Sequence, residues 1–487
     1  MPGVTISTAI RTGAVNEGVA PAATFFLLGT AERGKGSVAV AVNSLEDFET
    51  KFGEHVTGSY SWYSAKTFFE EGGVQMYFVK VNAAAGVAAT KALLGVSSAA
   101  GVTFTAVSKG VWGNSLGFAV TNNTTNFDVT ITYSGTTIFS GTGFEGLNAL
   151  VTAVNADATA ANYVTCALTA SAVNATLLVT AASSAPSNGA DGSVAKSDFI
   201  TAISLFTEEL GAGAVAAPGI ATGASDSALY DALRTHAASY NRIALAGFAS
   251  TATLAQARSA STGYTGTTSH EYMAFYHPWV TIPNDSVSVD LPPEAYVAAV
   301  RARTHNSTGP WKAYAGLASE ARFVTGLTLP VSRADADLMD ESYVNPLRLI
   351  NGRVRVYGAR SHSSVVEQWR FITHREVINY IAVEVNQRLE DLVFSTIDGR
   401  STLFANIINA IQSIVEPIRI EGGFYEGFAA DGRRTDYGYT IRCDNSLNPV
   451  DQLQEGTVKA RLGVRVSSVG DKIEVDLIKS NLTTALA

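Results

Sequence analysis

One stretch of the chain has the residue types of a phosphate-binding loop. Residues 29–35 read Gly-Thr-Ala-Glu-Arg-Gly-Lys, follow a predicted buried strand, and fit the start of the G-x-x-x-x-G-K-[ST] motif. In that motif the backbone N–H groups and the lysine hold phosphates, and the final hydroxyl holds Mg²⁺. Here Gly36 takes the place of the hydroxyl residue, and residues 38–42 read as a strand rather than a helix. The pattern favours a glycine-rich turn, and a P-loop NTPase is the alternative.

The histidines and cysteines have no spacing typical of a catalytic or metal site. None of the seven histidines lies in an H-x-x-x-H pair or beside a G-x-S-x-G sequence. His270 and His277 flank Glu271, but a strand would place them on opposite faces, so we interpret them as polar residues at strand ends. Cys166 and Cys443 are far apart in the chain. We therefore expect no enzyme activity, no metal and no cofactor.

Composition and charge argue against several further classes of function. A chain of 487 residues is too long for one simple core, so we expect several domains. The net charge of −9 argues against nucleic acid as the main partner. The longest apolar run, residues 19–28, contains Pro21 and is about half the length of a membrane span. No signal peptide is recognisable. We expect a soluble protein made in a cytoplasm, without membrane insertion.

The elements that could position a site are clearest between Arg353 and Val393. Residues 353–360 alternate between arginine and small apolar residues, which predicts a strand with one buried face. An apolar side chain then recurs every three or four positions, which predicts an amphipathic helix. Its stripe consists of Ile378, Ile381, Val385, Leu389 and Leu392. A second stripe, from Leu403 to Ile414, predicts another helix that ends at Pro417.

The earlier part of the chain has two different patterns. Residues 24–28 and 76–81 read as strands, and Ser44 is a predicted helix cap with Asp47 completing a capping box. Between Ala83 and Ala190 the composition shifts to Ala, Thr, Ser, Asn and Gly with few charges, which predicts an inserted β-rich module. Its strand-like runs are residues 103–107, 117–121, 127–133, 136–140, 163–168 and 175–180. Residues 198–346 return to alternating helices and strands.

Several short phrases occur in one order along the chain. They are L-G-T-A-E-R-G at residues 28–34, W-G-N at 112–114, G-P-W-K at 309–312, V-Y-G-A-R at 356–360 and W-R-F-I at 369–372. With these phrases the chain resembles the sheath proteins of contractile phage tails and of related contractile injection systems. The resemblance does not distinguish a phage from an injection system.

The resemblance implies a multidomain α+β or α/β fold. We expect a mixed α/β sheath core with an inserted β-rich domain and an extended arm at each end. The expected parts are an N-terminal arm (1–18), an α/β segment of the core (19–90), the peripheral insert (91–195), an α/β middle domain (196–350), a C-terminal core domain facing the tube (351–470) and a C-terminal arm (471–487).

The resemblance also implies how such a subunit works. Copies would stack as hexameric rings around a tail tube, exchange strands through their arms, and contract to drive the tube through a host envelope. The exchanged strands would contain Val4, Thr5, Ile6 and Ser7 at the N-terminus and Ile473, Val475 and Leu477 at the C-terminus. The candidate tube contacts are charged residues off the apolar stripe, namely Arg370, Arg375, Glu376, Glu384 and Arg388.

The implied partners are other copies of the chain, the tube protein, and the baseplate and tail terminator proteins, with no nucleic acid. The implied location is the virion, after assembly in the host cytoplasm. A surface-displayed β-rich adhesin is the second alternative.

Overall fold

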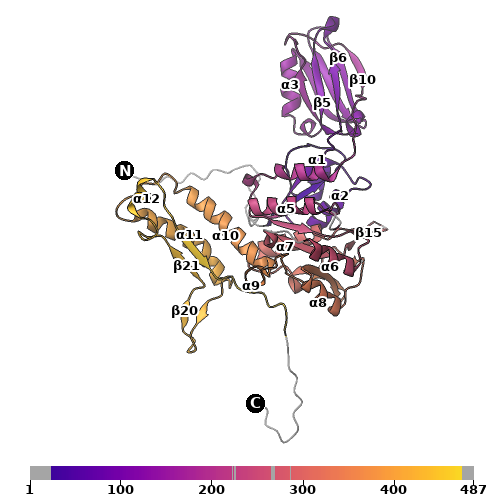
Figure 1. Ribbon diagram of the computed structural model, residues 1–487. Helices are drawn as coiled ribbons and strands as arrows, with labels where there is room; N and C mark the ends of the chain where they lie inside the picture. Colours follow the sequence, from indigo (N-terminus) through magenta and orange to yellow (C-terminus); the bar gives the residue numbers. More distant parts are fainter. Residues whose placement is uncertain (1–22, 222, 224–225, 265–268, 286, 474–487) are drawn as a thin grey trace, which may run out of the picture.

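The centre of the fold is an eight-stranded, mostly parallel sheet (Figure 1). The computed structural model describes residues 23–221, 223, 226–264, 269–285 and 287–473. The strand order is β18-β17-β13-β12-β11-β1-β3-β2, and the edge strands β2 and β18 are antiparallel to their neighbours. The strands are β1 (Phe25–Gly29), β2 (Val40–Val42), β3 (Met76–Lys80), β11 (Ala214–Ala216), β12 (Ile243–Ala246), β13 (Met273–His277), β17 (Val344–Ile350) and β18 (Arg353–Val356).

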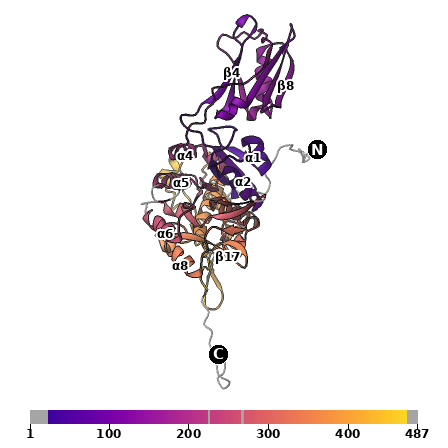
Figure 2. The ribbon, with the colours of Figure 1, turned by 90° about the vertical axis from the view of Figure 1, so that its right-hand side faces the viewer.

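Helices cover both faces of this sheet, which explains why its central strands are apolar throughout. Phe25 and Leu27 of β1 belong to the core on one face, and Phe26 and Leu28 to the core on the other. Figure 2 shows the two groups of helices on opposite sides of the central domain. The first face holds α1 (Leu45–Phe52), α2 (Ser61–Glu70) and α7 (Glu294–Ser307), and the second holds α4 (Lys196–Ala202), α5 (Ser227–Ser239), α6 (Leu254–Gly263) and α8 (Arg333–Glu341).

The Ser44 cap predicted for α1 is present, but the predicted capping box is only half formed. The Ser44 hydroxyl accepts a hydrogen bond from the backbone N–H of Asp47 (3.0 Å), and the Asp47 carboxylate accepts one from the N–H of Asn43 (3.1 Å). The first bond satisfies one of the N–H groups that a helix start otherwise leaves unpaired. The second comes from Asn43, the residue before the cap, whereas a capping box uses the N–H of the cap residue itself. The helix then buries Phe48 and Phe52 against the sheet.

A separate β-rich module stands at one end of the molecule (Figure 1). Its two sheets and one helix enclose a core that includes Phe104, Trp112 and Phe118. The expected strand at residues 175–180 is wrong, because that segment contributes only a bridge from Leu178 to Gly95, and the helix α3 was not foreseen. The elements are β4 (Ala88–Leu93), β5 (Val102–Lys109), β6 (Leu116–Asn122), β7 (Phe127–Tyr133), β8 (Thr136–Phe144), α3 (Leu147–Ala156), β9 (Val164–Leu168) and β10 (Ala181–Ser184).

The C-terminal domain is built on two long helices, α10 (Ile372–Glu390) and α11 (Thr402–Ile420), which lie side by side (Figure 1). The stripe predicted for α11 is buried, but the helix continues past Pro417 to Ile420. A proline near the last turn forfeits little hydrogen bonding, and Ile418 is buried in the domain core. The remaining elements are α9 (Val366–Trp369), β19 (Gly427–Phe428), β20 (Arg434–Asp436), β21 (Tyr439–Arg442), α12 (Val450–Gln454) and β22 (Arg461–Val464).

A small antiparallel sheet completes the middle of the chain, with strands β14 (Val280–Asn284), β15 (Val287–Leu291) and β16 (Gly326–Leu327). The predicted mixed α/β, multidomain fold class is confirmed. Among the described residues, no helix combines the length and apolar character that crossing a bilayer requires.

Candidate assembly surfaces

The loop at residues 29–35 has the wrong surroundings for phosphate. It folds over the carboxyl end of α1, where Arg33 donates hydrogen bonds to the carbonyl oxygens of Glu49 (2.8 Å) and Thr50 (2.7 Å). The backbone N–H of Arg33 also donates to the carbonyl of Phe52 (3.1 Å). A phosphate site needs the positive, N–H-rich amino end of a helix, whereas the carboxyl end is negative. The loop therefore caps a helix.

The same loop is also the platform on which the β-rich module rests. Arg33 stacks over the ring of Tyr163 (4.5 Å to the centroid), and Glu32 accepts a hydrogen bond from the hydroxyl of Tyr133. Strand β3, which pairs with β1, contributes Lys80, which donates to the hydroxyl of Ser108 (2.8 Å). Its burial lowers the pKa of Lys80 to about 8. The glycine-rich motif thus positions the module.

If the loop caps a helix and binds no phosphate, substitutions of Arg33 and of Lys35 should have different effects on stability. Arg33→Ala should destabilise the protein by about 1–3 kcal/mol, because it removes two hydrogen bonds to the last turn of α1 and the contact with Tyr163 from a buried side chain. Lys35→Ala should change stability by less than about 0.5 kcal/mol, because Lys35 is exposed. Thermal unfolding measures the stability change of each variant. Added Mg-ATP should leave the unfolding midpoint of the wild type unchanged. A nucleotide site would instead be supported if Mg-ATP raised the thermal unfolding midpoint of the wild type but not that of Lys35→Ala.

The position where parallel α/β sheets most often bind nucleotides lies between β1 and β11. There the strand order reverses, since the chain continues from β1 to β3 on one side and from β11 to β12 on the other. Side chains fill it. Tyr60 packs against Gly219 so closely that a Cβ at Gly219 would lie 2.7 Å from the Tyr60 ring. The Tyr60 ring also meets Trp279 edge to face at 5.3 Å. This geometry gives no support to the NTPase alternative.

The two histidines considered for a metal site are far from forming one. His277 is the last residue of β13, whereas His270 lies just before that strand and contacts a third histidine, His362, with 2.7 Å between their Nδ1 atoms. The Nε2 atom of His362 lies 3.0 Å from the carbonyl oxygen of Ser261. Burial lowers the pKa of His362 to about 4, so His362 is neutral at pH 7. Within the described residues, no three His, Cys, Asp or Glu side chains converge.

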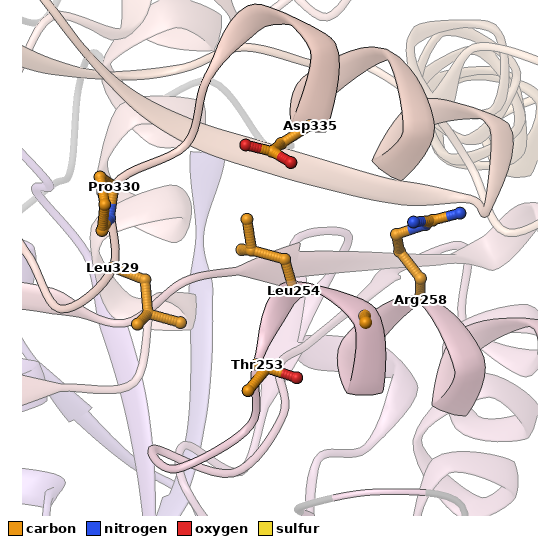
Figure 3. Close-up of a pocket in the computed structure, with 7 residues that line it drawn as sticks. Thr253, Leu254, Arg258, Leu329, Pro330 and Asp335 are labelled. Carbon is orange, nitrogen blue, oxygen red and sulfur yellow. The ribbon is translucent and has the colours of Figure 1, made fainter.

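A surface pocket of about 370 Å³ lies between α6 and α8 (Figure 3). Two helix starts border it, but each is already capped by its own chain. The hydroxyl of Thr253 accepts from the N–H of Gln256 (3.3 Å), and the hydroxyl of Ser332 accepts from the N–H of Asp335 (3.1 Å). Figure 3 shows Asp335 and Leu254 facing the pocket. Apolar side chains with Asp335 and Arg258 as the only charged residues among the described ones that line the pocket form no recognisable catalytic set.

Two of the candidate tube contacts are buried, and the expectation that they are exposed is wrong. The side chain of Glu376 is 1% exposed and forms a bidentate ion pair with Arg301 of α7, at 2.6 and 2.7 Å. Arg375 is also buried, stacks on Tyr272 and donates to Asn379 (2.9 Å). Most side chains of the amino-terminal half of α10 are buried, because this half docks into the middle domain.

The other three candidates lie nearer the surface. Arg370 contacts Asp340 (3.3 Å) and Asp471 (2.9 Å), which ties the last described segment to the start of α10. Arg388 is exposed on the carboxyl-terminal half of α10. Glu384 is half-buried on the same half, where desolvation raises its pKa despite the nearby Arg388.

The predicted arms lie largely outside the described residues. This holds for Val4, Thr5, Ile6 and Ser7 and for Val475 and Leu477. Ile473 is described, is 82% exposed, and belongs to no strand.

The β21–β22 sheet offers edges that fit added strands. It has two strands of four residues, and within the described residues neither outer edge carries a further strand. Its inner face rests on α11 through Ile441, Leu462 and Val464, which are only partly buried. Isolated two-stranded sheets are marginal in water, and additional strands stabilise them.

Sequence reasoning missed the buried contacts that join the domains. Besides Arg301 and Glu376, Asn379 donates to the carbonyl of Arg242 (3.2 Å), and Trp311 of the middle domain packs into the C-terminal core. Arg301 could have been noticed, since it interrupts an otherwise apolar stretch of α7 and such an arginine needs a partner.

Comparison with known proteins finds similar folds among solved structures, without a match at the level of sequence. No family model and no curated protein matches the sequence. A chain of the anti-feeding prophage baseplate structure matches with a TM-score of 0.56 and 14% identity over 99% of both chains. A chain of the contracted PVC sheath complex, an extracellular contractile injection system, matches with a TM-score of 0.56 and 15% identity over 99% of this chain and 98% of its own.

The sheath tail protein Lin1278 from Listeria innocua matches with a TM-score of 0.60 and 15% identity over 87% of this chain and 89% of its own. The likeness extends over nearly the whole length, including the insert and the C-terminal domain. The chain therefore has the multidomain α/β fold of contractile sheath proteins.

Proposed function

We propose that this protein is the structural sheath subunit of a contractile phage tail or injection system. The observation that supports this best is the structural likeness, over 99% of both chains, to a chain of the anti-feeding prophage helical sheath in its contracted state. Copies form hexameric rings that stack around a tube, with contacts to baseplate and terminator proteins at the two ends. The particle is assembled in the host cytoplasm, and its contraction drives the tube through the envelope of a target cell.

Strand exchange links the copies in this proposal. The β21–β22 sheet has two open edges, and its four-residue strands leave alternate backbone groups on each edge available. Alternating apolar residues at Val4 and Ile6, and at Ile473, Val475 and Leu477, have the period that a half-buried added strand requires. The occupants are therefore the terminal segments of neighbouring copies. Their apolar side chains would complete the partly buried face over α11.

The work of contraction does not depend on nucleotide in this proposal. The loop at residues 29–35 caps a helix, and the sheet crevice is filled by Tyr60. The extended sheath is then a state of higher free energy set at assembly, and contraction releases that energy through rigid repositioning of linked copies. Arg388, Glu384 and Arg370 are the proposed tube contacts, because each lies at or near the surface of the domain placed against the tube.

Electron microscopy of the purified protein tests the function directly. A sheath subunit should form hollow tubes with transverse striations, because linked rings repeat along one axis. The adhesin alternative predicts discrete monomers or small oligomers that bind glycans. Particles that stay discrete at all concentrations, with and without tube protein, would contradict the sheath proposal.

A further inference from the structure

A basic surface surrounds the exposed Leu317 in the turn η9 (Gly316–Ser319). Leu317 is 75% exposed, and it borders a hollow of about 510 Å³ together with Arg303, Glu320, Arg322 and Arg353. We call this the Leu317 surface. An exposed leucine beside arginines is typical of protein contacts, since such interfaces are enriched in arginine around apolar anchors.

The acidic groups near the Leu317 surface are already engaged within the chain. Glu71 is fully buried and accepts hydrogen bonds from Arg303 and from the backbone N–H groups of Arg322, Phe323 and Val324. Glu320 is paired with Arg355. Arg322 and Arg353 are exposed, and neither forms an ion pair within the described part of the chain. They give this surface a positive charge that faces solvent.

A cleft of the opposite charge lies between α10 and the amino ends of β11 and β12. Its volume is about 580 Å³, with Glu208, Glu209 and Glu390 at the rim and Ala382 and Val383 on the α10 wall. We call it the α10 cleft. No lysine or arginine lines it among the described residues.

The loop that carries two of these glutamates is held in place. The guanidinium of Arg242 is fully buried and donates to the carbonyl oxygens of Phe206, Thr207 and Gly211, at 2.6, 2.6 and 2.9 Å. These bonds fix both ends of the segment from which Glu208 and Glu209 project. The cleft therefore presents a preorganised charge pattern.

The two surfaces lie on elements that cover opposite faces of the central sheet. The Leu317 surface adjoins α7 in the first core, whereas the α10 cleft adjoins the end of α5, which packs in the second core. The Leu317 surface and the α10 cleft of the same copy therefore cannot contact each other. A contact between different patches of identical chains is heterologous and extends into rings or helices.

We propose that the Leu317 surface of one copy docks into the α10 cleft of a second copy. Leu317 enters the cleft against Ala382 and Val383, while Arg322 and Arg353 face Glu209 and Glu390. This contact rests on the proposed function, since it is one of the lateral contacts of the polymer, and it is independent of strand exchange. Because the charges lie at a rim, the association weakens as ionic strength rises.

A charge exchange between two variants tests the contact. The first carries Arg322→Glu and Arg353→Glu, and the second carries Glu209→Lys and Glu390→Lys. Each alone should need at least about tenfold more protein to associate, since it presents like charges across the contact. An equal mixture should recover association, because the acidic surface of one variant fits the basic cleft of the other. Sedimentation velocity measures all three samples at one salt concentration.

A matched control reverses two other exposed or half-exposed cations, with Lys91→Glu and Arg333→Glu, and should associate like wild type. Circular dichroism checks that every variant is folded. A mixture that sediments like its separate components overturns the contact, as do variants that associate like wild type. If the wild-type protein forms no tubes in microscopy, that result counts against the sheath function. The contact itself is still tested by whether the mixed variants associate in sedimentation velocity.

Discussion

Removal of residues 1–8, or of residues 472–487, is expected to give a folded protein that forms no tubes at the concentrations where the full chain forms them. The cores of the central domain, the insert and the C-terminal domain use residues between Ala23 and Val466, so thermal stability should remain near that of the full chain. The second truncation ends after Asp471 and keeps its ion pair with Arg370. Neither deletion therefore removes a described buried contact.

The size of the expected defect follows from the open edges of β21–β22. A strand added to a four-residue edge forms a few backbone hydrogen bonds, each contributing about 1 kcal/mol net. Losing one arm should therefore raise the protein concentration needed for polymerisation roughly 30-fold or more, since every 1.4 kcal/mol corresponds to about a factor of ten. Light scattering against concentration and negative-stain microscopy measure this threshold.

A larger deletion serves as the control, because it removes more chain at a different place. Val87 and Ala190 are bridged by two backbone hydrogen bonds, at 2.8 and 3.0 Å, so an Asn-Gly turn can replace residues 88–189. This variant should still polymerise, since the module stands at one end of the molecule, away from β21–β22 (Figure 1). Normal tubes from either arm truncation would contradict strand exchange, and failure of the control would give the module a part in assembly.

Local sequence signals predicted the elements that depend on neighbouring residues. The Ser44 cap, strand β7 and the stripe of α11 each follow from residues within a few positions, and the structure contains them. Strand and helix existence could be predicted across the central sheet for the same reason. The Gly29–Lys35 loop shows the limit of such signals. Its glycines predicted a turn, but its role depends on Tyr133 and Tyr163 of a distant module.

Burial of charge could not be predicted from α10 alone. Glu376 lies off the apolar stripe, so the pattern placed it on the surface. Its partner Arg301 is 75 positions away, and only the packing of α10 against α7 brings them together. His270 and His362 are likewise separated by 92 positions. Charged or polar residues on a helix can therefore be enclosed wherever that helix lies between two domains.

Replacement of Glu376 is expected to cause the largest loss of stability of any single substitution considered. Arg301 and Glu376 are 2% and 1% exposed, with both guanidinium-to-carboxylate bonds near 2.7 Å or shorter. Burial alone would lower the pKa of Arg301, but the Glu376 carboxylate raises it above its usual value, so the arginine remains charged. Glu376→Ala leaves that buried charge without a partner, which should cost about 3–5 kcal/mol in the free energy of unfolding.

Paired substitutions distinguish a charge effect from a packing effect. Arg301→Met with Glu376→Leu removes both charges while keeping apolar volume, and should recover most of the stability lost in Glu376→Ala. Glu390→Gln, on the exposed end of the same helix, should change stability by less than about 0.5 kcal/mol. Urea unfolding followed by circular dichroism measures the series.

The same pair has a consequence for assembly, because α10 carries the C-terminal domain. Its amino-terminal half is fixed by Arg301 and by the bond from Asn379 to Arg242, while its other half packs on α11. Loss of the ion pair should therefore loosen the junction between the domains and weaken polymerisation even where the remaining fold persists. Limited proteolysis should then cut in the segment before α10, near the exposed Ser364 and Val365, faster in Glu376→Ala than in wild type or in the double variant. Equal cleavage rates in all three would show that the junction is held by its apolar contacts, with Trp311 among them, rather than by the buried charges.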